Sequence, residues 1–400
     1  MAESADPKGQ CWPDEQQELL LRAALLRGEG ALSAWDKWRS RVNPDSLDAG
    51  SARLLPLLYR NLPELRDNDP LVTRLKESYR TTWSLNQSLF RQMASLLGSL
   101  HEAGIETLVL KGGALAPRYY RDYGVRPMVD FDILVREERA RTVMDSLAGS
   151  GWTSKYKSPA ALIPYEHSTE FHDGAGRKLD LHWRVFWEGS REVTDEEFWS
   201  GAVAVEIHGV RTLILNPADQ LLHVCVHGAK WDVCPPLRWV ADALTILRSI
   251  GTEMDWNRLH RQAQTRRLLL PLSDTLAYLE KFENGSVPAK ALELVKRRGV
   301  EGRMERFTYE VRLGPSRPLR AAAVLWQWSN TFRFSRRPGL RPKMIEFLSY
   351  LKCLWGIKHT WQVPLHIIHK SARALGGIAA LGIRRLAHNR AANSRAGLSD

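Results

Sequence analysis

Two neighbouring stretches decide the fold: residues 108–115, LVLKGGAL, and residues 124–135, GVRPMVDFDILV. Successive side chains of a strand point to opposite faces, so Asp130 and Asp132 are predicted to share one face. The other face is apolar and predicted to be buried; it comprises Val129, Phe131, Ile133 and Val135. Aspartate is depleted in strands, and two carboxylates about 7 Å apart repel each other and lose hydration when buried. A hard divalent cation removes both costs, so the pair predicts a Mg²⁺ site shared with substrate phosphates.

A third carboxylate lies in a second alternating segment, residues 178–186. Asp180 and His182 fall on its polar face, and leucine and tryptophan side chains form the other. The preceding strand-like segment, residues 166–172, is joined to it by residues 173–177, which are rich in turn formers. A hairpin beside the first strand could therefore bring Asp180 to the aspartate pair. Three carboxylates around two metal ions about 3.5–4 Å apart would suit phosphoryl or nucleotidyl transfer.

Gly112 and Gly113 end the apolar segment 107–110 and precede a helix-like run, residues 114–120. A glycine turn at that place lets backbone N–H groups approach a phosphate, and the start of a helix adds its positive end. Three nearby cations could hold a triphosphate: Lys111, Arg121 and Arg126.

Together these segments resemble the polymerase-β-type nucleotidyltransferase superfamily. More narrowly, they resemble the bacterial family called uncharacterised nucleotidyltransferases. The matching motifs are KGGAL at 111–115, Arg126 with DFDILV at 130–135, LDLHW at 179–183, and a later segment at 219–242 that includes DQLLH, HGAK and LRWVAD. The resemblance spans roughly residues 15–282. One departure is Gly113, where the superfamily often has serine; a phosphate or metal contact there must come from the backbone.

The resemblance implies an α+β fold: a polymerase-β-like core, with a mixed sheet and helices, plus helical N-terminal and C-terminal additions. It implies Mg²⁺-dependent transfer of a nucleoside monophosphate from an NTP to a hydroxyl acceptor, with release of pyrophosphate. Two Mg²⁺ ions are expected, and Mn²⁺ could replace them. The acceptor could be a small molecule or sugar, a peptide or protein, or an RNA end.

The site residues follow from these patterns. Asp130, Asp132 and Asp180 are the expected catalytic metal ligands. The expected nucleotide-binding residues are Lys111, Gly112, Gly113 and Arg126. His182 is expected either to touch the acceptor or to make a structural hydrogen bond. The competing hypothesis is a catalytically inactive nucleotide sensor or scaffold.

Periodicity divides the chain into a helical N-terminal region (1–103), an α/β core (104–216), a helical domain (217–330) and a basic amphipathic tail (331–400). Helices are predicted at residues 14–27, 54–61, 71–101, 138–150, 218–230, 237–250, 256–267 and 269–282.

The tail carries nearly all the net charge: 13 Lys+Arg against 2 Asp+Glu, a net of +11, whereas the whole chain is +12. Cations interleaved with Trp, Leu and Ile at helical spacing, at 344–355 and 372–386, suggest a helix at an anionic membrane surface. Binding to nucleic-acid phosphates and docking on the protein body are the alternatives.

Composition and cysteine spacing narrow the possible compartments and metal sites of the protein. Four widely spaced cysteines predict no disulfide framework, which suits a reducing compartment. The first 13 residues are polar and predict no signal peptide, and no apolar run reaches about 18 residues. We therefore expect a cytoplasmic protein, with a peripheral position at the inner membrane face as the alternative. A zinc site is disfavoured because the chain offers one histidine pair without a second ligand pair; the residues concerned are His223, Cys225, His227 and Cys234.

Overall fold

The computed structural model describes residues 12–62, 69–187, 193–230, 236–296, 306, 309 and 339–369. The chain divides into two compact units. The first unit takes its described residues from 1–155 and 163–317, and the second from 156–162 and 318–400. The first unit combines most of the three regions predicted before residue 331, except residues 156–162 and 318–330, and one hydrophobic core runs through it from Leu20 to Val295.

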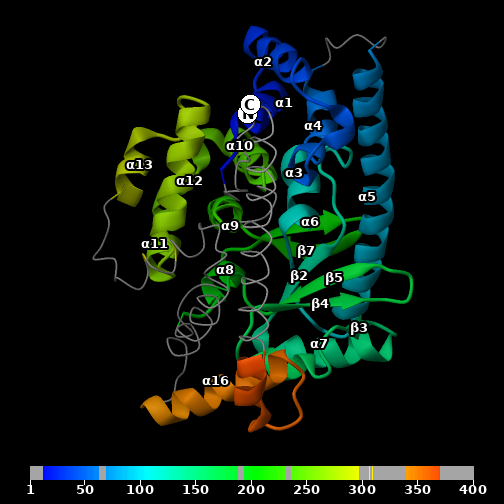
Figure 1. The fold of residues 1–400 in the computed structure, drawn as a ribbon, viewed down its shortest axis with the longest axis vertical. Coiled ribbons are helices and arrows are strands. Elements are labelled where there is room, and N and C mark those ends of the chain that lie inside the picture. The colour runs from blue at the N-terminus through cyan, green and yellow to red at the C-terminus, as the bar shows by residue number, and fades with distance from the viewer. Residues whose placement is uncertain are drawn as a thin grey trace, which may run out of the picture. The chain divides into compact units, whose positions relative to one another are not determined.

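A seven-stranded mixed sheet lies at the centre of the first unit (Figure 1). In spatial order its strands are β3 (Thr153–Ser154), β4 (Ser168–His172), β5 (Lys178–His182), β2 (Phe131–Val135), β1 (Thr107–Leu110), β7 (Val210–Ile214) and β6 (Val203–Ile207). β1 is antiparallel to β2 and parallel to β7, whereas β2 is parallel to β5. The α+β fold class predicted from the sequence is confirmed.

The strand register places the predicted site at one end of the sheet. Leu110, the last residue of β1, lies opposite Asp132 near the start of β2. Asp132 in turn lies opposite Asp180 of β5. β5 forms a hairpin with β4, closed by Asp173, whose side chain accepts hydrogen bonds from the backbone N–H groups of Ala175 and Arg177 at 3.0 and 2.8 Å. The predicted hairpin therefore brings Asp180 beside Asp132.

Helices precede the sheet in the chain: α1 (Glu15–Leu25), α2 (Glu29–Arg39), α3 (Ala49–Ala52), α4 (Leu55–Asn61) and α5 (Pro70–Glu102). Asp14 and Gln17 form a capping box at the start of α1. Asp69 caps α5, and Pro70 occupies a first-turn position where its missing N–H costs nothing. The long helix α5 lies beside the sheet in Figure 1 and contacts β1 and β7.

The remaining helices of this unit are α6 (Lys111–Leu115), α7 (Glu137–Gly149), α8 (Glu196–Ser200), α9 (Pro217–Gly228), α10 (Arg238–Ile250), α11 (Trp256–Thr265), α12 (Leu269–Phe282) and α13 (Ala289–Lys296). A single π-type turn, Ala116–Tyr120, follows α6 directly. All eight helices predicted from periodicity are present, and no end is shifted by more than two residues. The sequence-based prediction omitted α2, α3, α8 and α13.

The strand prediction was wrong at its first two residues. β2 begins at Phe131, and Val129, expected in the core, is 68% exposed. Asp130 is consequently in the loop before the strand. The reason is that β1 ends at Leu110, where Lys111 takes a φ of 45° and turns the chain into α6, so residues before Phe131 have no strand to pair with. The buried Asn86 side chain also holds this loop by donating to the carbonyls of Tyr123 (2.7 Å) and Arg126 (2.8 Å).

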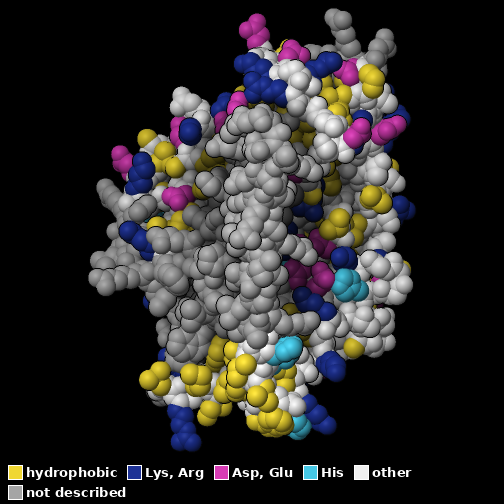
Figure 2. All heavy atoms as spheres, in the orientation of Figure 1, with side chains coloured by type: hydrophobic (Ala, Val, Ile, Leu, Met, Phe, Trp, Pro, Cys, Tyr) yellow, Lys and Arg dark blue, Asp and Glu magenta, His cyan; other side chains and the backbone are white. Residues whose placement is uncertain are grey.

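The second unit contains a 3₁₀ turn, Pro159–Leu162, in contact with α16 (Leu340–Leu354), and residues 362–369 are also helical. Phe347, Tyr350 and Leu351 form the buried face of α16. Figure 2 shows hydrophobic side chains gathered on the surface around α16, with lysine and arginine among them. The predicted tail helix at 372–386 lies outside the described residues. Among the described residues, no helix is long and apolar enough to cross a membrane.

Candidate active site

The centre of the site is a pair of facing carboxylates. Asp132 is 3% exposed and projects from β2, and Asp180 projects from the paired position of β5. His182 follows two residues after Asp180 and therefore shares its face of β5. One ligand atom from each of Asp132, Asp180 and His182 lies within 4.8 Å of the others.

Two nitrogen groups bridge the two carboxylates. The Lys111 ammonium lies 2.6 Å from Asp132 Oδ1 and 3.6 Å from Asp180 Oδ2. His182 Nε2 lies 3.2 Å from Asp132 Oδ1 and 3.0 Å from Asp180 Oδ2. The hydrogen-bonding role expected as one alternative for His182 is therefore present.

The protonation equilibria reflect this charge pairing. Burial would raise the pKa of Asp132, but the charges of Lys111 and His182 outweigh burial and lower it. Asp180 is affected in the same way, chiefly through His182, and its pKa is well below its usual range. Burial would lower the pKa of His182, but the charge of Asp180 and the hydrogen bonds to both carboxylates raise it to about 9. At neutral pH the cluster thus contains two anions and two cations.

Asp130 is the least neutralised of the three predicted carboxylates. Burial and the nearby charge of Asp132 raise its pKa, and Lys111 counters them only partly. Among the described residues, no cation forms a direct ion pair with Asp130. A half-buried carboxylate in this position is suited to a further cation.

This donor set fits a divalent metal ion. The two facing carboxylates, with Asp130 nearby, supply the oxygen ligands that Mg²⁺ and Mn²⁺ prefer. Two carboxylates so close together also require positive charge, which Lys111 and His182 provide here.

The two glycines of the motif have packing roles in the structure. A Cβ atom added to Gly112 would clash with the Arg126 guanidinium and would lie 2.8 Å from Met128 Sδ. One added to Gly113 would lie 2.6 Å from Val109 Cγ1. Both glycines are buried inside α6, and Gly112 also lines a pocket beside the carboxylates. The contact of both glycines with phosphate remains a prediction. Gly112 is the better placed of the two, because it lines the pocket and Gly113 does not.

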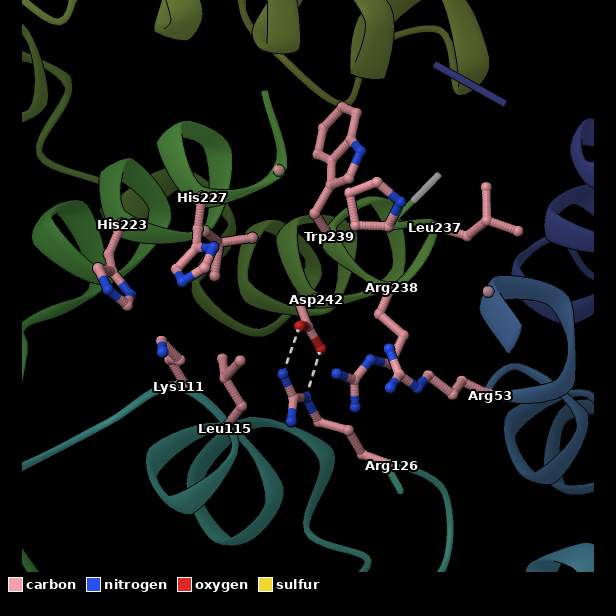
Figure 3. Close-up of a pocket in the computed structure, with 14 residues that line it drawn as sticks. Arg53, Lys111, Leu115, Arg126, His223, His227, Leu237, Arg238, Trp239 and Asp242 are labelled. Carbon is pink, nitrogen blue, oxygen red and sulfur yellow. Dashed lines mark hydrogen bonds and ion pairs between the residues drawn. The ribbon is translucent and has the colours of Figure 1, made fainter. Parts of the chain in front are cut away.

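Two adjoining pockets open next to this cluster. The first is lined by Asp130, Asp132, Gly112 and the loop 126–129, and the second by the facing surfaces of α9 and α10 together with Leu115 of α6 (Figure 3). Four cationic residues line both pockets: Arg53, Lys111, Arg126 and Arg238. The carboxylates and the helical region therefore share one cationic wall.

Arg126, expected to contact the nucleotide, forms a buried bidentate ion pair with Asp242 of α10. Its Nε and one terminal nitrogen each lie 2.9 Å from an Asp242 oxygen, and Figure 3 shows both bonds. The Tyr120 hydroxyl donates to the same carboxylate at 2.9 Å. This network fixes the loop before β2 to the helical region. Arg126 still lines both pockets, so its nucleotide role remains a prediction, whereas the exposed Arg121 lines neither.

Sequence patterns alone did not identify several residues of this site. Asp242 and Arg238 are four residues apart and so lie on one face of α10, a spacing that could have drawn attention to them. Arg53 lies in a short helical turn far away in sequence and gave no local signal. His223 and His227, considered above for zinc, line the second pocket with ring centroids 5.7 Å apart. Burial lowers the pKa of His223 to about 3, so it is uncharged at neutral pH.

Comparisons with known proteins give a family match. The model of a family described as uncharacterised nucleotidyltransferase matches residues 49–284, which is more than half of the chain. No curated protein matches the sequence. One similar solved structure is that of an antigenic nucleotidyltransferase-like protein from Paracoccidioides brasiliensis, at 11% identity, with 52% of this chain and 92% of that chain covered and a TM-score of 0.33.

Proposed function

This chain belongs to the family of uncharacterised nucleotidyltransferases, and from that premise we propose that it transfers a nucleoside monophosphate from an NTP to a hydroxyl acceptor, releasing pyrophosphate. One observation carries the proposal: Asp132 and Asp180 face each other across paired strands, beside Lys111 and a pocket with a cationic wall. Carboxylates next to clustered cations suit a metal ion that is held together with substrate phosphates.

Asp132 and Asp180, with Asp130 beside them, would hold Mg²⁺ or Mn²⁺. Two such ions are the expectation. A bound divalent ion would neutralise charge on the transferred phosphate and lower the pKa of the attacking hydroxyl.

The protein's own cations would orient the triphosphate. Lys111 is the nearest amine to both carboxylates, and it lies next to Gly112 where the pocket begins. It is therefore assigned to the phosphates next to the bond that breaks. Arg126 contributes charge to the same wall, although its guanidinium is already oriented by Asp242.

Asp180 is a weak candidate for a general base. Its pKa, lowered mainly by His182 against the effect of burial, makes it a poor proton acceptor at neutral pH. Its proposed role is to hold charge. His182 stays protonated next to it, because the Asp180 charge and the hydrogen bonds to both carboxylates overcome burial and raise its pKa to about 9. His182 is assigned to orienting both carboxylates, with contact to the acceptor as its alternative role.

One observation favours the second candidate, a catalytically inactive nucleotide sensor or scaffold. Asp132 and Asp180 are already neutralised by Lys111 and His182. A protein that only binds nucleotide could use the cationic wall without a metal ion.

Label transfer separates the two candidates. The protein is incubated with Mg²⁺, each NTP labelled at the α-phosphate, and fractions supplying sugar, protein or RNA acceptors. Transfer should occur with the wild type and be lost in Asp132→Asn and in Asp180→Ala, while NTP affinity falls far less. Arg141→Gln, an exposed arginine of α7, is the matched control and should remain active. Binding of NTP by the wild type without any transfer would favour the sensor.

The second unit supports a proposal about the partner of the tail. Six large apolar side chains of residues 339–369 are exposed: Leu340 (74%), Met344 (40%), Ile345 (50%), Trp361 (67%), Leu365 (59%) and Ile368 (65%). Leu365 and Ile368 are three residues apart on one face of the helix 362–369, and Trp361 lies in the turn directly before it. Four lysines and arginines accompany them against one glutamate. An apolar face flanked by cations fits an anionic membrane surface, which is the proposed partner.

A further inference from the structure

The cationic wall combines side chains from parts of the chain that are distant in sequence. Arg53 follows α3, Lys111 begins α6, Arg126 lies in the loop before β2, and Arg238 begins α10. Figure 3 shows the guanidinium groups of Arg53, Arg126 and Arg238 converging between α10 and the loop that carries Arg126.

Two of the four cations of this wall, Arg53 and Arg238, have no direct ion pair with a described carboxylate, and the nearby Asp130 lines only the first pocket. Lys111 is paired with Asp132 and Asp180, and Arg126 with Asp242. Arg238 donates to the Pro127 carbonyl, and no described carboxylate forms an ion pair with Arg238 or Arg53. Burial, followed by the charge of Arg126, lowers the pKa of Arg238 to about 10; Asp242 opposes this shift and Arg53 adds to it. Bringing these like charges together is unfavourable unless an anion joins them.

The start of α10 adds to the same positive field. This helix has 13 residues, and its first turn, Arg238 and Trp239, lines the pocket together with Pro236 and Leu237. The Leu237 side chain cannot accept a capping hydrogen bond. The positive end of the helix dipole therefore faces the pocket where the guanidinium groups meet.

We propose that Arg53 and Arg238, with the first turn of α10, form a subsite for a phosphate group that is separate from the phosphate reacting at Asp132 and Asp180. This inference rests on the proposed function. A guanidinium donates two parallel hydrogen bonds to a phosphate, and two arginines that lack carboxylate partners match a doubly charged group better than a single carboxylate. Apart from Asp242, which is paired with Arg126, the rest of the pocket lining is uncharged and includes Leu115, Leu237 and the neutral His223. The ligand is thus anionic at one end and uncharged at the other.

Such a phosphate could come from two sources. It could be the terminal phosphate of the NTP, with the triphosphate running along the wall from Lys111 to Arg238. It could instead be a phosphate carried by the acceptor, such as a phosphorylated sugar or a nucleic-acid end, which would place the acceptor between α9 and α10.

The first experiment measures binding of tripolyphosphate by calorimetry to the full-length protein without metal, so it requires no catalysis. Arg53→Gln and Arg238→Gln should each weaken binding by about tenfold or more, because each removes a charge-assisted contact. Arg141→Gln should bind like the wild type. Arg53 is exposed, so its variant should fold normally even if Arg238→Gln is destabilised. No binding by the wild type, or equal binding by all four proteins, would overturn the subsite.

The second experiment identifies the source by comparing a non-hydrolysable NTP analogue with the matching nucleoside monophosphate. If the subsite takes the terminal phosphate, Arg53→Gln should weaken binding of the analogue by about tenfold and leave the monophosphate unchanged. If the subsite takes a phosphate of the acceptor, Arg53→Gln should bind both nucleotides as the wild type does. Once loaded with the analogue, the wild type should still bind inorganic phosphate, whereas the loaded variant should not. If the wild type shows no label transfer but binds tripolyphosphate through Arg53 and Arg238, the proposed function is contradicted and the phosphate subsite is still supported.

Discussion

Replacing Lys111 by methionine tests whether its ammonium occupies the place of a metal ion. The substitution keeps the length of the side chain and removes the charge that lies 2.6 Å from Asp132 and 3.6 Å from Asp180. Removing one partner of a buried ion pair costs about 3–5 kcal/mol of unfolding free energy. His182 still bonds both carboxylates, so the lower value, about 3 kcal/mol, is expected in metal-free protein. With an unfolding entropy of about 2.1 cal/mol/K per residue, a loss of about 3 kcal/mol in a unit of this size corresponds to a fall in Tm of about 5 °C.

The effect of added metal should then differ between the two proteins. In the wild type a divalent ion must compete with the Lys111 ammonium, whereas in Lys111→Met the carboxylates have lost that competitor. An ion present at 100 times its dissociation constant stabilises the folded state by about 2.7 kcal/mol, nearly the amount lost. Excess Mn²⁺ should therefore raise the Tm of the variant much more than that of the wild type.

Differential scanning fluorimetry in EDTA and in excess Mn²⁺ measures both effects. Lys290→Met, at an exposed position of α13, controls for loss of a surface lysine and should match the wild type under both conditions. Equal melting of Lys111→Met and wild type in EDTA would show that Lys111 does not neutralise the carboxylates. Equal Mn²⁺ shifts in both proteins would refute the competition between Lys111 and the metal.

Three further results are expected. Asp242→Leu should lower the unfolding free energy, measured by urea denaturation, by about 3–5 kcal/mol, because Arg126 is left buried and unpaired. The double variant with Arg126→Met should recover most of this loss. A loss below about 1 kcal/mol would contradict the role of this pair. His223 has a pKa of about 3 in the folded protein because of burial, against about 6.5 in the unfolded chain, so its contribution to stability is complete above about pH 6.5 and is lost as the pH falls towards 3. Consequently His223→Leu should flatten the dependence of unfolding free energy on pH by about 1 kcal/mol per unit between about pH 4 and 6, and an unchanged slope would disprove this assignment. Full-length protein should sediment with anionic but not neutral vesicles, and Trp361→Ser with Leu365→Ser should abolish this; tighter binding to RNA than to anionic vesicles at equal salt would contradict a membrane partner.

The parts of the site that the sequence predicted correctly depend on local patterns. Alternation with a period of two assigned β2 and β5, and the turn formers at 173–177 predicted the hairpin that brings Asp180 beside Asp132. Since both strands are buried on their apolar face, a register shift by one residue would have exposed that face. Local sequence therefore predicted the face on which each aspartate lies, and the parallel pairing of β2 with β5 places Asp132 and Asp180 opposite each other.

The parts that were not predicted depend on contacts between distant residues. Asp130 lies outside β2 because β1 ends at Leu110, and Asn86 and Arg238, from α5 and α10, also hold the preceding loop by its carbonyls. Arg126 is oriented by Asp242, 116 residues later in the chain. No periodic pattern encodes such pairs, so the cationic wall became visible only in three dimensions.

The charge balance of the site predicts that metal and nucleotide bind cooperatively. Asp132 and Asp180 are neutralised by Lys111 and His182, so a divalent ion arriving alone brings two positive charges to a site in which Asp130 is the remaining carboxylate. The triphosphate supplies the missing negative charge and gives Lys111 a new partner, which frees the carboxylates for the ion. Each ligand should therefore tighten the other by the same factor, and typical coupling of 1–3 kcal/mol corresponds to roughly 5–150-fold. Titration of Mn²⁺ by electron paramagnetic resonance, with and without a non-hydrolysable NTP analogue, measures this factor. In Lys111→Met the coupling should shrink, because that site already lacks the competing ammonium; an unchanged coupling would mean that Lys111 does not exchange between carboxylate and phosphate.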